Sequence, residues 1–460
     1  MLITSISGIR GTIGGKIGEN LTPPDIVGFI SAYGILLQKN NINANTISVV
    51  IGRDGRASGG MILEMVIQTL LSMGIDVINL DYATTPTVAM EVMRNNADGG
   101  IIVTASHNPK EYNGLKMLNN TGEFLSDESG KEILTIKQQG NFNYAKIDVL
   151  GKNTKSYNHT RDHINDICNL ELVNIDAIRN AKIKVSVDAI NSVGGLAVPI
   201  LLQKLGVEMI GLYCEVNGDF QHKPEPLEEN LGELKALVHK TESHLGIAVD
   251  PDVDRLVLID EQGQMFGEEY TIVSVADYVL SKTPGSTVSN LSSSKALADV
   301  TTKYGQQYHT SAVGEKNVVE KMKEVNAVIG GEGSGGVIYP TLHYGRDALV
   351  GIALFLSYIA EQNIKVSELR NNYPCYFMSK QKIELSSRKD ISRILDILEQ
   401  ESVTEKTSRI DGLKIDFDDS WLHVRSSNTE PIMRIITEAK TQKDADNLAQ
   451  NYISKIKGII

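Results

Sequence analysis

Hydrophobic positions along the chain form short runs that alternate with longer amphipathic stretches. Residues 47–51 are a β-branched apolar run, and residues 61–73 after them repeat apolar side chains at helical spacing. The same order recurs at residues 183–187, where a helical stretch to Lys204 follows the apolar run. Further apolar runs of strand length cover residues 99–104, 245–249, 256–259 and 327–329. Strands that alternate with helices predict an α/β fold.

Several of these runs end in short loops that are acidic or rich in glycine. The loops cover residues 52–59, 188–194, 250–254 and 330–336. Because the strand-and-loop units echo one another, they indicate about three α/β domains of related design.

Beyond residue 370 the pattern changes to an α+β type. Residues 414–417 and 421–424 are typical of a hairpin, residues 432–438 of a further strand and residues 441–457 of an amphipathic helix. We therefore expect four domains, at residues 1–150, 151–260, 261–370 and 371–460.

Composition narrows the class of protein. With 41% hydrophobic and 22% charged residues among 460, the chain is an ordinary globular protein. Its net charge of -12 argues against a nucleic-acid partner. The first residues lack the basic segment of a signal peptide and no apolar stretch reaches bilayer length, so we expect no membrane partner and a cytoplasmic location. Cys168, Cys214 and Cys375 lie far apart with no CxxC pair, which predicts buried thiols in a reducing compartment.

The most informative segment is Thr104-Ala-Ser-His-Asn-Pro109, which closes the apolar run at residues 99–104. Asn-Pro is a strong breaker of regular structure, so Ser106 is expected at the carboxyl end of a buried strand. Open α/β sheets keep their reactive groups at that end. The alternative is an ordinary turn in which Ser and Asn side chains bond their own backbone.

Three aspartates, Asp250, Asp252 and Asp254, alternate on a short loop that contains proline. Three like charges at one point are unfavourable unless a cation lies among them, and hard oxygen ligands favour magnesium or calcium. Glu261 stands where an EF-hand has its twelfth ligand, but Arg255 replaces the required glycine and strands replace the flanking helices. A solvated acidic turn is the other alternative.

The segment Arg425-Ser-Ser-Asn-Thr-Glu-Pro431, with Arg434 beyond it, gathers two guanidinium groups, three hydroxyls and an amide. This set of donors suits the oxygens of a phosphate, which arginine can bind in bidentate fashion. A polar loop whose side chains cap turns is the alternative.

The segment Gly331-Glu-Gly-Ser-Gly-Gly336 satisfies the pattern GxGxxG, but residues 337–340 after it are not helical in character. A dinucleotide site is therefore disfavoured, and Glu332 and Ser334 suit sugar hydroxyls or a plain turn. The nine histidines show no HExxH or paired spacing, so zinc is not expected. His343 is expected to be structural or at the surface.

Taken in order, SGIRG, TASHNP, NGLK, DPDVDR, GEGSGG and RSSNTEP resemble the motifs of the α-D-phosphohexomutase superfamily. That group includes phosphoglucomutase, phosphomannomutase and phosphoglucosamine mutase. The resemblance spans the whole chain. It implies three related α/β domains plus a C-terminal α+β domain around a central cleft, with the phosphoserine, metal, sugar and phosphate loops in the first, second, third and fourth domain.

The resemblance also implies a role for each motif. Ser106 matches the phosphoserine, which also contacts the metal, and Asp250, Asp252 and Asp254 match the magnesium ligands. Glu332 and Ser334 match the sugar-selecting loop. The phosphate site is matched by Arg425, Ser427, Asn428, Thr429 and Arg434. The reacting centre is matched by Arg10, His107, Lys116 and Arg255.

The implied reaction interconverts hexose 6-phosphate and 1-phosphate through a bisphosphorylated sugar, with Mg²⁺ and a sugar bisphosphate as activator. Many members carry His where this chain has Gly336, so the proton acceptor is open between Lys116, His107 and His343. GEGSGG with SNTEP matches neither the typical bacterial phosphoglucosamine mutases nor the typical phosphomannomutase/phosphoglucomutases, and is more similar to the archaeal-type branch, whose members act on several hexose phosphates. Because related chains of that type supply the hexosamine pathway, the resemblance slightly favours phosphoglucosamine mutase, with phosphomannomutase/phosphoglucomutase as the alternative. A sugar phosphatase and a non-catalytic sugar-phosphate sensor are remote alternatives, and the sequence does not give the oligomeric state.

Overall fold

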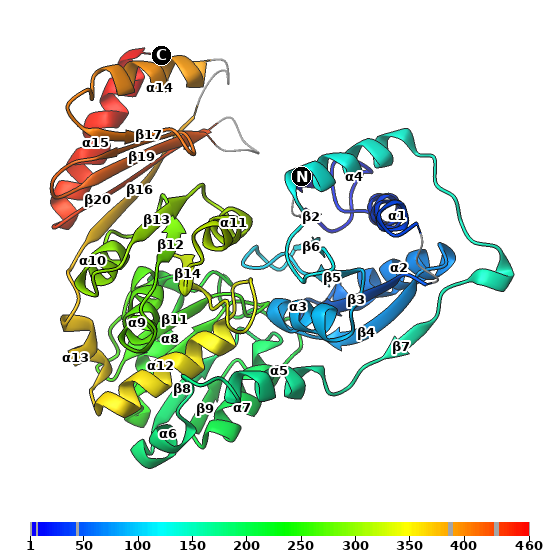
Figure 1. Cartoon of the computed structure of the whole chain (residues 1–460), viewed down its shortest axis with the longest axis horizontal. Helices are drawn as coiled ribbons and strands as arrows, with labels where there is room; N and C mark the ends of the chain where they lie inside the picture. The colour runs from blue at the N-terminus through cyan, green and yellow to red at the C-terminus, as the bar shows by residue number, and fades with distance from the viewer. Residues whose placement is uncertain (1, 6–7, 43–45, 385–389, 427–431, 460) are drawn as a thin grey trace. The chain divides into compact units, whose positions relative to one another are not determined.

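The computed structural model describes residues 2–5, 8–42, 46–384, 390–426 and 432–459 (Figure 1). The chain divides into two compact units. Unit 1 comprises Met1–Thr271 and Gly335–Leu369, and unit 2 comprises Ile272–Ser334 and Arg370–Ile460.

Unit 1 begins with a seven-stranded sheet in the order β1-β2-β6-β5-β3-β4-β7. The strands are β1 (Leu2–Ser5), β2 (Gly8–Thr12), β3 (Ser48–Arg53), β4 (Asp76–Tyr82), β5 (Gly99–Val103), β6 (Tyr112–Leu118) and β7 (Asn153–Lys155). The accompanying helices are α1 (Pro23–Asn40), α2 (Gly59–Ser72), α3 (Thr85–Arg94) and α4 (Asp127–Gln139). The strands β5, β3, β4 and β7 run parallel.

The central strands of this sheet are buried on both faces. Ile101 and Val103 of β5 pack into the core that contains Phe29 of α1, whereas Ile102 packs with Val88 of α3 on the other face. Alternate side chains of a strand point to opposite faces, so the continuous apolar run that predicted β5 is the pattern of a strand covered by helices on both sides.

A second sheet in unit 1 has the order β11-β10-β8-β9. Its strands are β8 (Lys184–Asp188), β9 (Glu208–Leu212), β10 (Leu245–Val249) and β11 (Leu256–Asp260). Its helices are α5 (His159–Cys168), α6 (Ile175–Ala181), α7 (Gly194–Leu205) and α8 (Gly232–Thr241). The strands β10 and β11 are antiparallel, and the three aspartates lie on the loop that joins them. Unit 1 also contains β15 (Gly336–Ile338) and α12 (Ala348–Gln362).

Unit 2 contains a parallel set, β12 (Thr287–Asn290), β13 (Tyr308–Ser311) and β14 (Ile329–Glu332), with α10 (Ala296–Lys303) and α11 (Glu315–Val325). The helices α9 (Glu268–Lys282) and α13 (Val366–Asn371) each cross from one unit to the other.

The C-terminal part of unit 2 is an antiparallel sheet in the order β16-β20-β19-β18-β17. Its elements are β16 (Phe377–Glu384), α14 (Asp390–Gln400), β17 (Lys406–Ser408), β18 (Leu413–Asp416), β19 (Trp421–Ser426), β20 (Ile432–Ala439) and α15 (Gln442–Ile459). Figure 1 shows α15 alongside this sheet, and its Tyr452 and Ile456 share a core with Val424 and Ile435. Three mixed α/β sheets and an antiparallel C-terminal sheet confirm the predicted fold class.

The predicted hairpin is present, with Leu413 opposite Val424 and Asp416 opposite Trp421. The strand predicted at residues 327–329 is wrong in its bounds, because β14 runs from Ile329 to Glu332. Its Gly330 lies in the sheet, where an added Cβ would meet Met322 Sδ at 2.4 Å. Glycine here serves close packing rather than a turn.

The expectation of three buried thiols is wrong. Cys168 is buried, Cys214 is partly exposed and Cys375 is exposed. Cys375 lies in the connection between α13 and β16, where neither a helix nor a strand includes it. Among the described helices, none is both long enough and apolar enough to cross a membrane.

Candidate active site

Ser106 lies in the turn that follows β5, and its backbone is strained. Its φ is 49°, in the left-handed region that non-glycine residues rarely adopt. The amide of Ser106 donates to Thr104 Oγ1 at 2.8 Å, and its hydroxyl donates to Asp250 Oδ2 at 3.0 Å. His107 Nδ1 is 3.2 Å from the same hydroxyl. Strain that the surroundings maintain is a feature of functional sites.

A buried arginine maintains the serine turn. The Arg56 side chain is 1% exposed and pairs with Asp54 Oδ2 at 3.1 Å. Its guanidinium donates at 2.6 to 2.8 Å to the backbone carbonyl oxygens of Ser106, Asn108, Pro109 and Tyr112. Asp54 Oδ2 also accepts from the Thr104 hydroxyl at 2.7 Å. The ion pair therefore fixes both the backbone and the anchoring threonine of the turn.

The aspartate loop supplies three carboxylates that are fully buried. Asp250 Oδ1 accepts from the amides of Asp254 and Arg255, each at 3.1 Å. Asp252 Oδ2 accepts from the Thr85 hydroxyl at 2.6 Å. One ligand atom from each of the three aspartates lies within 4.8 Å of those of the other two, an arrangement that could hold a metal ion.

Two cations contact the same carboxylates on their Oδ2 atoms. Lys116 Nζ lies 2.6 Å from Asp252 Oδ2 and 3.0 Å from Asp254 Oδ2, and Arg346 donates to Asp254 Oδ2 at 2.7 Å. Asp252 Oδ1 and Asp254 Oδ1 are buried without a hydrogen-bond partner among the described residues. A buried carboxylate oxygen without a partner is costly, so two such atoms on one loop fit a cation that completes the site.

The charges in the triad are uneven. Burial, with the neighbouring carboxylates of Asp254 and Asp252, raises the pKa of Asp250 well above its usual range. Burial acts in the same direction on Asp254, but Arg346, Lys116 and Arg255 outweigh it and hold the pKa of that carboxyl well below its usual range. Burial lowers the pKa of Lys116, but the Asp252 and Asp254 carboxylates raise it by more, so this amine is a cation.

His107 is kept neutral beside the serine. Burial lowers its pKa to about 2, with further lowering by Arg255, Arg10 and Arg346 and an opposing effect of Asp254. Arg255 donates to Glu225 Oε1 at 3.1 Å, and its buried Nε has no partner among the described residues. Arg10 donates to Asn108 Oδ1 at 3.1 Å. A neutral imidazole among guanidinium groups is a hydrogen-bond acceptor in a region that attracts anions.

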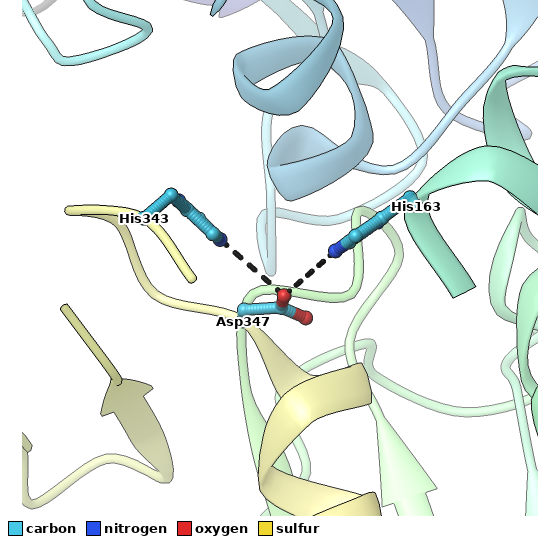
Figure 2. Close-up of side chains that lie close together, drawn as sticks. All are labelled: His163, His343 and Asp347. Carbon is cyan, nitrogen blue, oxygen red and sulfur yellow. Dashed lines mark hydrogen bonds and ion pairs between the residues drawn. The ribbon is translucent and has the colours of Figure 1, made fainter. Parts of the chain in front are cut away.

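The other two proposed proton acceptors have carboxylate partners. Lys116 is engaged with two carboxylates and is charged. His343 is 5% exposed, and its Nε2 lies 3.3 Å from Asp347 Oδ2 (Figure 2). The EF-hand alternative also fails, because Glu261 accepts from the Ser367 amide at 3.2 Å rather than contacting the aspartate loop.

The sugar-loop residues belong to unit 2. Glu332 ends β14 and is buried, and its Oε1 accepts from Asn290 Nδ2 at 2.9 Å and from the Gly314 amide at 3.2 Å. Ser334 is partly exposed, and Gly333 between them donates its amide to Ser293 Oγ at 3.0 Å.

Two arginines of the predicted phosphate site oppose each other in unit 2. Arg425 on β19 is the cross-strand partner of Arg434 on β20. Arg425 NH1 lies 3.7 Å from Asp411 Oδ2, and its buried Nε has no partner among the described residues. Burial lowers the pKa of Arg425, Arg434 lowers it further, and Asp411 and Glu332 oppose the change. Like charges at opposed positions are unfavourable, so this pair suits an anion. Ser427, Asn428 and Thr429 lie outside the described residues.

Sequence reasoning missed Asp54, Arg56, Thr85, Glu225 and Arg346. Asp54 and Arg56 stand just after β3, which is the sheet neighbour of β5. Polar groups at the carboxyl ends of adjacent parallel strands meet at one edge, and this signal could have found them. Thr85 and Arg346 contact the aspartate loop only through tertiary structure, and nothing in their local sequence marks them.

Comparison with known proteins extends this picture to the whole chain. Family models described as phosphoglucomutase/phosphomannomutase alpha/beta/alpha domains I, II and III match residues 2–144, 161–263 and 267–376. The model of the C-terminal domain of the same family matches residues 380–454.

Individual proteins that resemble this chain carry names of the same family. A phosphoglucomutase/phosphomannomutase of Thermococcus kodakarensis is 36% identical over 441 residues, covering 95% of each chain. A phosphoglucosamine/phosphogalactosamine mutase of Sulfurisphaera tokodaii is 32% identical over 462 residues, covering 98% of each. The crystal structure of a phosphoglucomutase/phosphomannomutase family protein from Burkholderia thailandensis superimposes with a TM-score of 0.84 at 25% identity, covering 99% of this chain and 97% of the other.

The fold and the similarities define the class of protein, which is a phosphohexomutase, an isomerase of sugar phosphates. Within that class the chain belongs to the phosphoglucomutase/phosphomannomutase family.

Proposed function

We propose that the chain interconverts hexose 6-phosphate and hexose 1-phosphate through a phosphorylated Ser106, with glucosamine 6-phosphate and glucosamine 1-phosphate as the preferred pair. The observation that carries the proposal is the contact of the strained Ser106 hydroxyl with Asp250 at 3.0 Å, beside two carboxylate oxygens that lack a partner among the described residues. A phosphoryl group on Ser106 would stand where a cation and a ring of basic side chains can hold its charge.

Each transfer step exchanges one P–O bond for another. A hydroxyl of the sugar attacks the phosphorus of phosphoserine, the bond from phosphorus to Ser106 Oγ breaks, and a bisphosphorylated sugar forms. The proton of the attacking hydroxyl leaves, and one proton returns to Ser106 Oγ. The second step runs in reverse from the other phosphate of the sugar. Such reactions need mainly positioning and charge stabilisation, for which we assign Arg10, Lys116 and Arg255.

The metal ion of the proposal is Mg²⁺, held by Asp250, Asp252 and Asp254 and by an oxygen on Ser106. Buried carboxylate oxygens are the donors that this ion prefers, and the partnerless Oδ1 atoms of Asp252 and Asp254 fit it. When bound, the ion supplies charge neutralisation for the phosphoryl group.

His107 is the group we assign to the proton at Ser106. Its Nδ1 is 3.2 Å from the hydroxyl, so it is placed to accept the proton of Ser106 as the bond to phosphorus forms and to return it later. The charge of a phosphoryl group beside the ring would oppose the lowering of its pKa by burial and by Arg255, Arg10 and Arg346. The carboxylates of Asp252 and Asp254 keep Lys116 protonated, so we assign it an electrostatic role.

Unit 2 supplies recognition in this proposal. Arg425 and Arg434, with Ser427, Asn428 and Thr429, bind the phosphate that is not reacting. Glu332 and Ser334 bind sugar hydroxyls. The opposed arginines on β19 and β20 favour a mutase over a phosphatase, because hydrolysis needs no second phosphate site. The intact serine and aspartates disfavour a sensor. A sugar bisphosphate would activate the enzyme by phosphorylating Ser106.

The preferred sugar is tested by direct competition. Relatives of similar identity carry the names phosphoglucomutase/phosphomannomutase and phosphoglucosamine mutase, and the phosphomannomutase/phosphoglucomutase activity is therefore the alternative. The experiment compares kcat/KM for glucosamine 6-phosphate, glucose 1-phosphate and mannose 1-phosphate, with Mg²⁺ and a hexose bisphosphate present. The largest value for glucosamine 6-phosphate supports the assignment, and a larger value for either neutral sugar overturns it.

A further inference from the structure

His163, His343 and Asp347 form a buried polar cluster (Figure 2), and Ala348, the residue after Asp347, donates its amide to the Val253 carbonyl of the aspartate loop. His163 comes from α5, and Asp347 is the residue that caps the N-terminus of α12. Both rings face the same carboxylate oxygen, with Nε2 of His163 at 2.9 Å and Nε2 of His343 at 3.3 Å from Asp347 Oδ2. Among the described residues, no hydrogen bond or ion pair joins these three side chains to Ser106.

His163 joins the first turns of two helices. Its Nε2 contacts Asp347, whose other oxygen, Oδ1, accepts from the amides of Leu349 at 2.8 Å and Val350 at 3.3 Å at the start of α12. Its Nδ1 lies 3.0 Å from Thr87 Oγ1 in the first turn of α3. One imidazole therefore fixes the spacing between the N-terminal turns of α3 and α12.

These two helix starts hold the aspartate loop. On the α3 side, the Thr85 amide donates to the Asp252 carbonyl at 2.9 Å, and its hydroxyl donates to Asp252 Oδ2 at 2.6 Å. On the α12 side, the Ala348 amide donates to the Val253 carbonyl at 3.2 Å, and Arg346 donates to Asp254 Oδ2 at 2.7 Å. Each proposed metal ligand on either side of Val253 thus has its own helix as a support.

The loop needs such support because its backbone is strained at Val253. The φ of this residue is 62°, a left-handed value that is a clear outlier for a β-branched side chain. A strained turn persists only where its neighbours hold it in place. The two helix starts provide that hold, and His163 keeps them together.

The outer ring nitrogen of His343 favours hydrogen bonds over a metal ion in the histidine cluster. The 2.9 Å between His163 Nε2 and Asp347 Oδ2 is an ordinary N–H···O distance, and the 3.3 Å from His343 Nε2 is slightly longer. His343 Nδ1 has no partner among the described residues, whereas a histidine that binds a metal usually donates its other N–H.

We propose that His163 is a positioning residue for the metal site, acting through Thr87 and Asp347 on the helix starts that hold Asp252 and Asp254. The inference rests on the proposed function only in taking the aspartate triad as the site of a divalent cation. Outer partners of metal ligands change affinity by about 10- to 100-fold when removed, and we expect about a 10-fold effect here.

The test measures binding of Mn²⁺, used as the probe ion, by electron paramagnetic resonance titration of the full chain without substrate. His163→Phe removes both contacts, and His163→Gln keeps a donor placed to reach Asp347. His159→Phe is the matched control, because His159 is a buried histidine of the same helix whose ring nitrogens, among the described residues, lie within hydrogen-bond distance of the carbonyl oxygens of Ser156 and Tyr82 and not of the aspartate loop. Thermal denaturation gives the stability of each variant.

We expect the Kd for Mn²⁺ to rise about 10-fold in His163→Phe, to rise less in His163→Gln and to stay within about twofold in His159→Phe. The inference would be overturned if the His163 and His159 variants lost the same Tm and bound Mn²⁺ with the same Kd. That result would leave the proposed metal site standing. The proposed metal site would instead be overturned if the wild-type protein bound no Mn²⁺, or if Asp252→Asn bound Mn²⁺ with the same Kd as the wild type. Stoichiometric zinc in the purified protein, lost in His163→Phe, would also contradict the assignment, because the cluster would then be a metal centre of its own.

Discussion

The serine and aspartate region of unit 1 and the arginine region of unit 2 are built in opposite ways. The three aspartates are fully buried, and two residues beside them, Ser106 and Val253, have left-handed backbone. Arg425 retains 18% exposure of its side chain, Arg434 is exposed, and the ion pair of Arg425 with Asp411 spans 3.7 Å. The first region is fixed before any ligand arrives, whereas the second presents one partly exposed and one exposed guanidinium group.

This difference in burial indicates which step each region serves. Preorganised and desolvated groups stabilise charge that develops during a reaction, because no reorganisation is needed at that moment. Accessible arginines on a regular sheet suit a phosphate that must bind, leave and bind again in another orientation. Changes in the first region should therefore affect turnover, and changes in the second should affect substrate affinity.

The largest expected effect is that of Ser106→Ala. Removal of the nucleophile should reduce kcat by at least about 10³-fold, because no phosphoryl group can be stored on the enzyme. Steady-state kinetics and circular dichroism measure the activity and the fold. The control is Ser129→Ala on α4, which should retain wild-type turnover, and a kcat of Ser106→Ala near that of the control would refute the division between the regions.

Next in size is Asp252→Asn, which keeps the shape of the side chain and removes its charge. We expect Mn²⁺ binding to weaken by at least about 100-fold and turnover to fall with it. The Tm without metal should fall, because Lys116 loses one of its two carboxylate partners, and relief of the repulsion among the three carboxylates should offset part of that loss. Calorimetry with and without Mg²⁺ and Mn²⁺ titration provide the measurements, with Asp416→Asn in unit 2 as the control. Undiminished metal binding in Asp252→Asn would show that the triad is not the metal site.

Arg425→Ala should act on binding rather than on chemistry. Loss of a charged hydrogen-bonding partner costs about 1.5–3 kcal/mol, so we expect KM to rise about 10- to 100-fold with a smaller change in kcat. Arg409→Ala is the control, because Arg409 is a partly exposed arginine of the same domain that pairs with Asp396. If kcat fell while KM stayed constant, Arg425 would belong with the reacting groups and the comparison would fail.

The smallest effect concerns the pH dependence of stability in unit 2. Burial lowers the pKa of His423 on β19 to about 4. Its Nδ1 accepts from the Ser292 hydroxyl at 2.8 Å, and its Nε2 donates to the Asp411 carbonyl at 2.6 Å. Because the unfolded histidine titrates near 6.5, the unfolded state binds more protons between pH 4 and 6.5, and stability falls as the pH falls through that window.

The change should be on the order of 2 kcal/mol between pH 6.5 and 5. Thermal denaturation of wild type, His423→Gln and the control His309→Gln isolates it, since only His423→Gln should lose this part of the pH dependence. Parallel pH profiles for all three proteins would show that His423 is not held neutral.

Much of the fold could be predicted because the central strands carry uninterrupted apolar runs and the helices carry regular amphipathic ones. Candidate site residues could be predicted where they lie at strand ends, as with Ser106 after β5 and Asp250 after β10. Thr85 and Arg346 were not visible, because their partners lie 167 and 92 residues away in the sequence. Support of this kind depends on tertiary packing, which local pattern does not encode.

The central claim is that Ser106 gives and receives the phosphoryl group. The most direct measurement is peptide mass spectrometry of the enzyme after incubation with Mg²⁺ and a hexose bisphosphate, followed by a chase with hexose monophosphate. We expect one phosphoryl group on the peptide that contains Ser106, none in Ser106→Ala, and its transfer to the sugar during the chase. A phosphoryl group on another residue, or one on Ser106 that survives the chase while turnover continues, would contradict it.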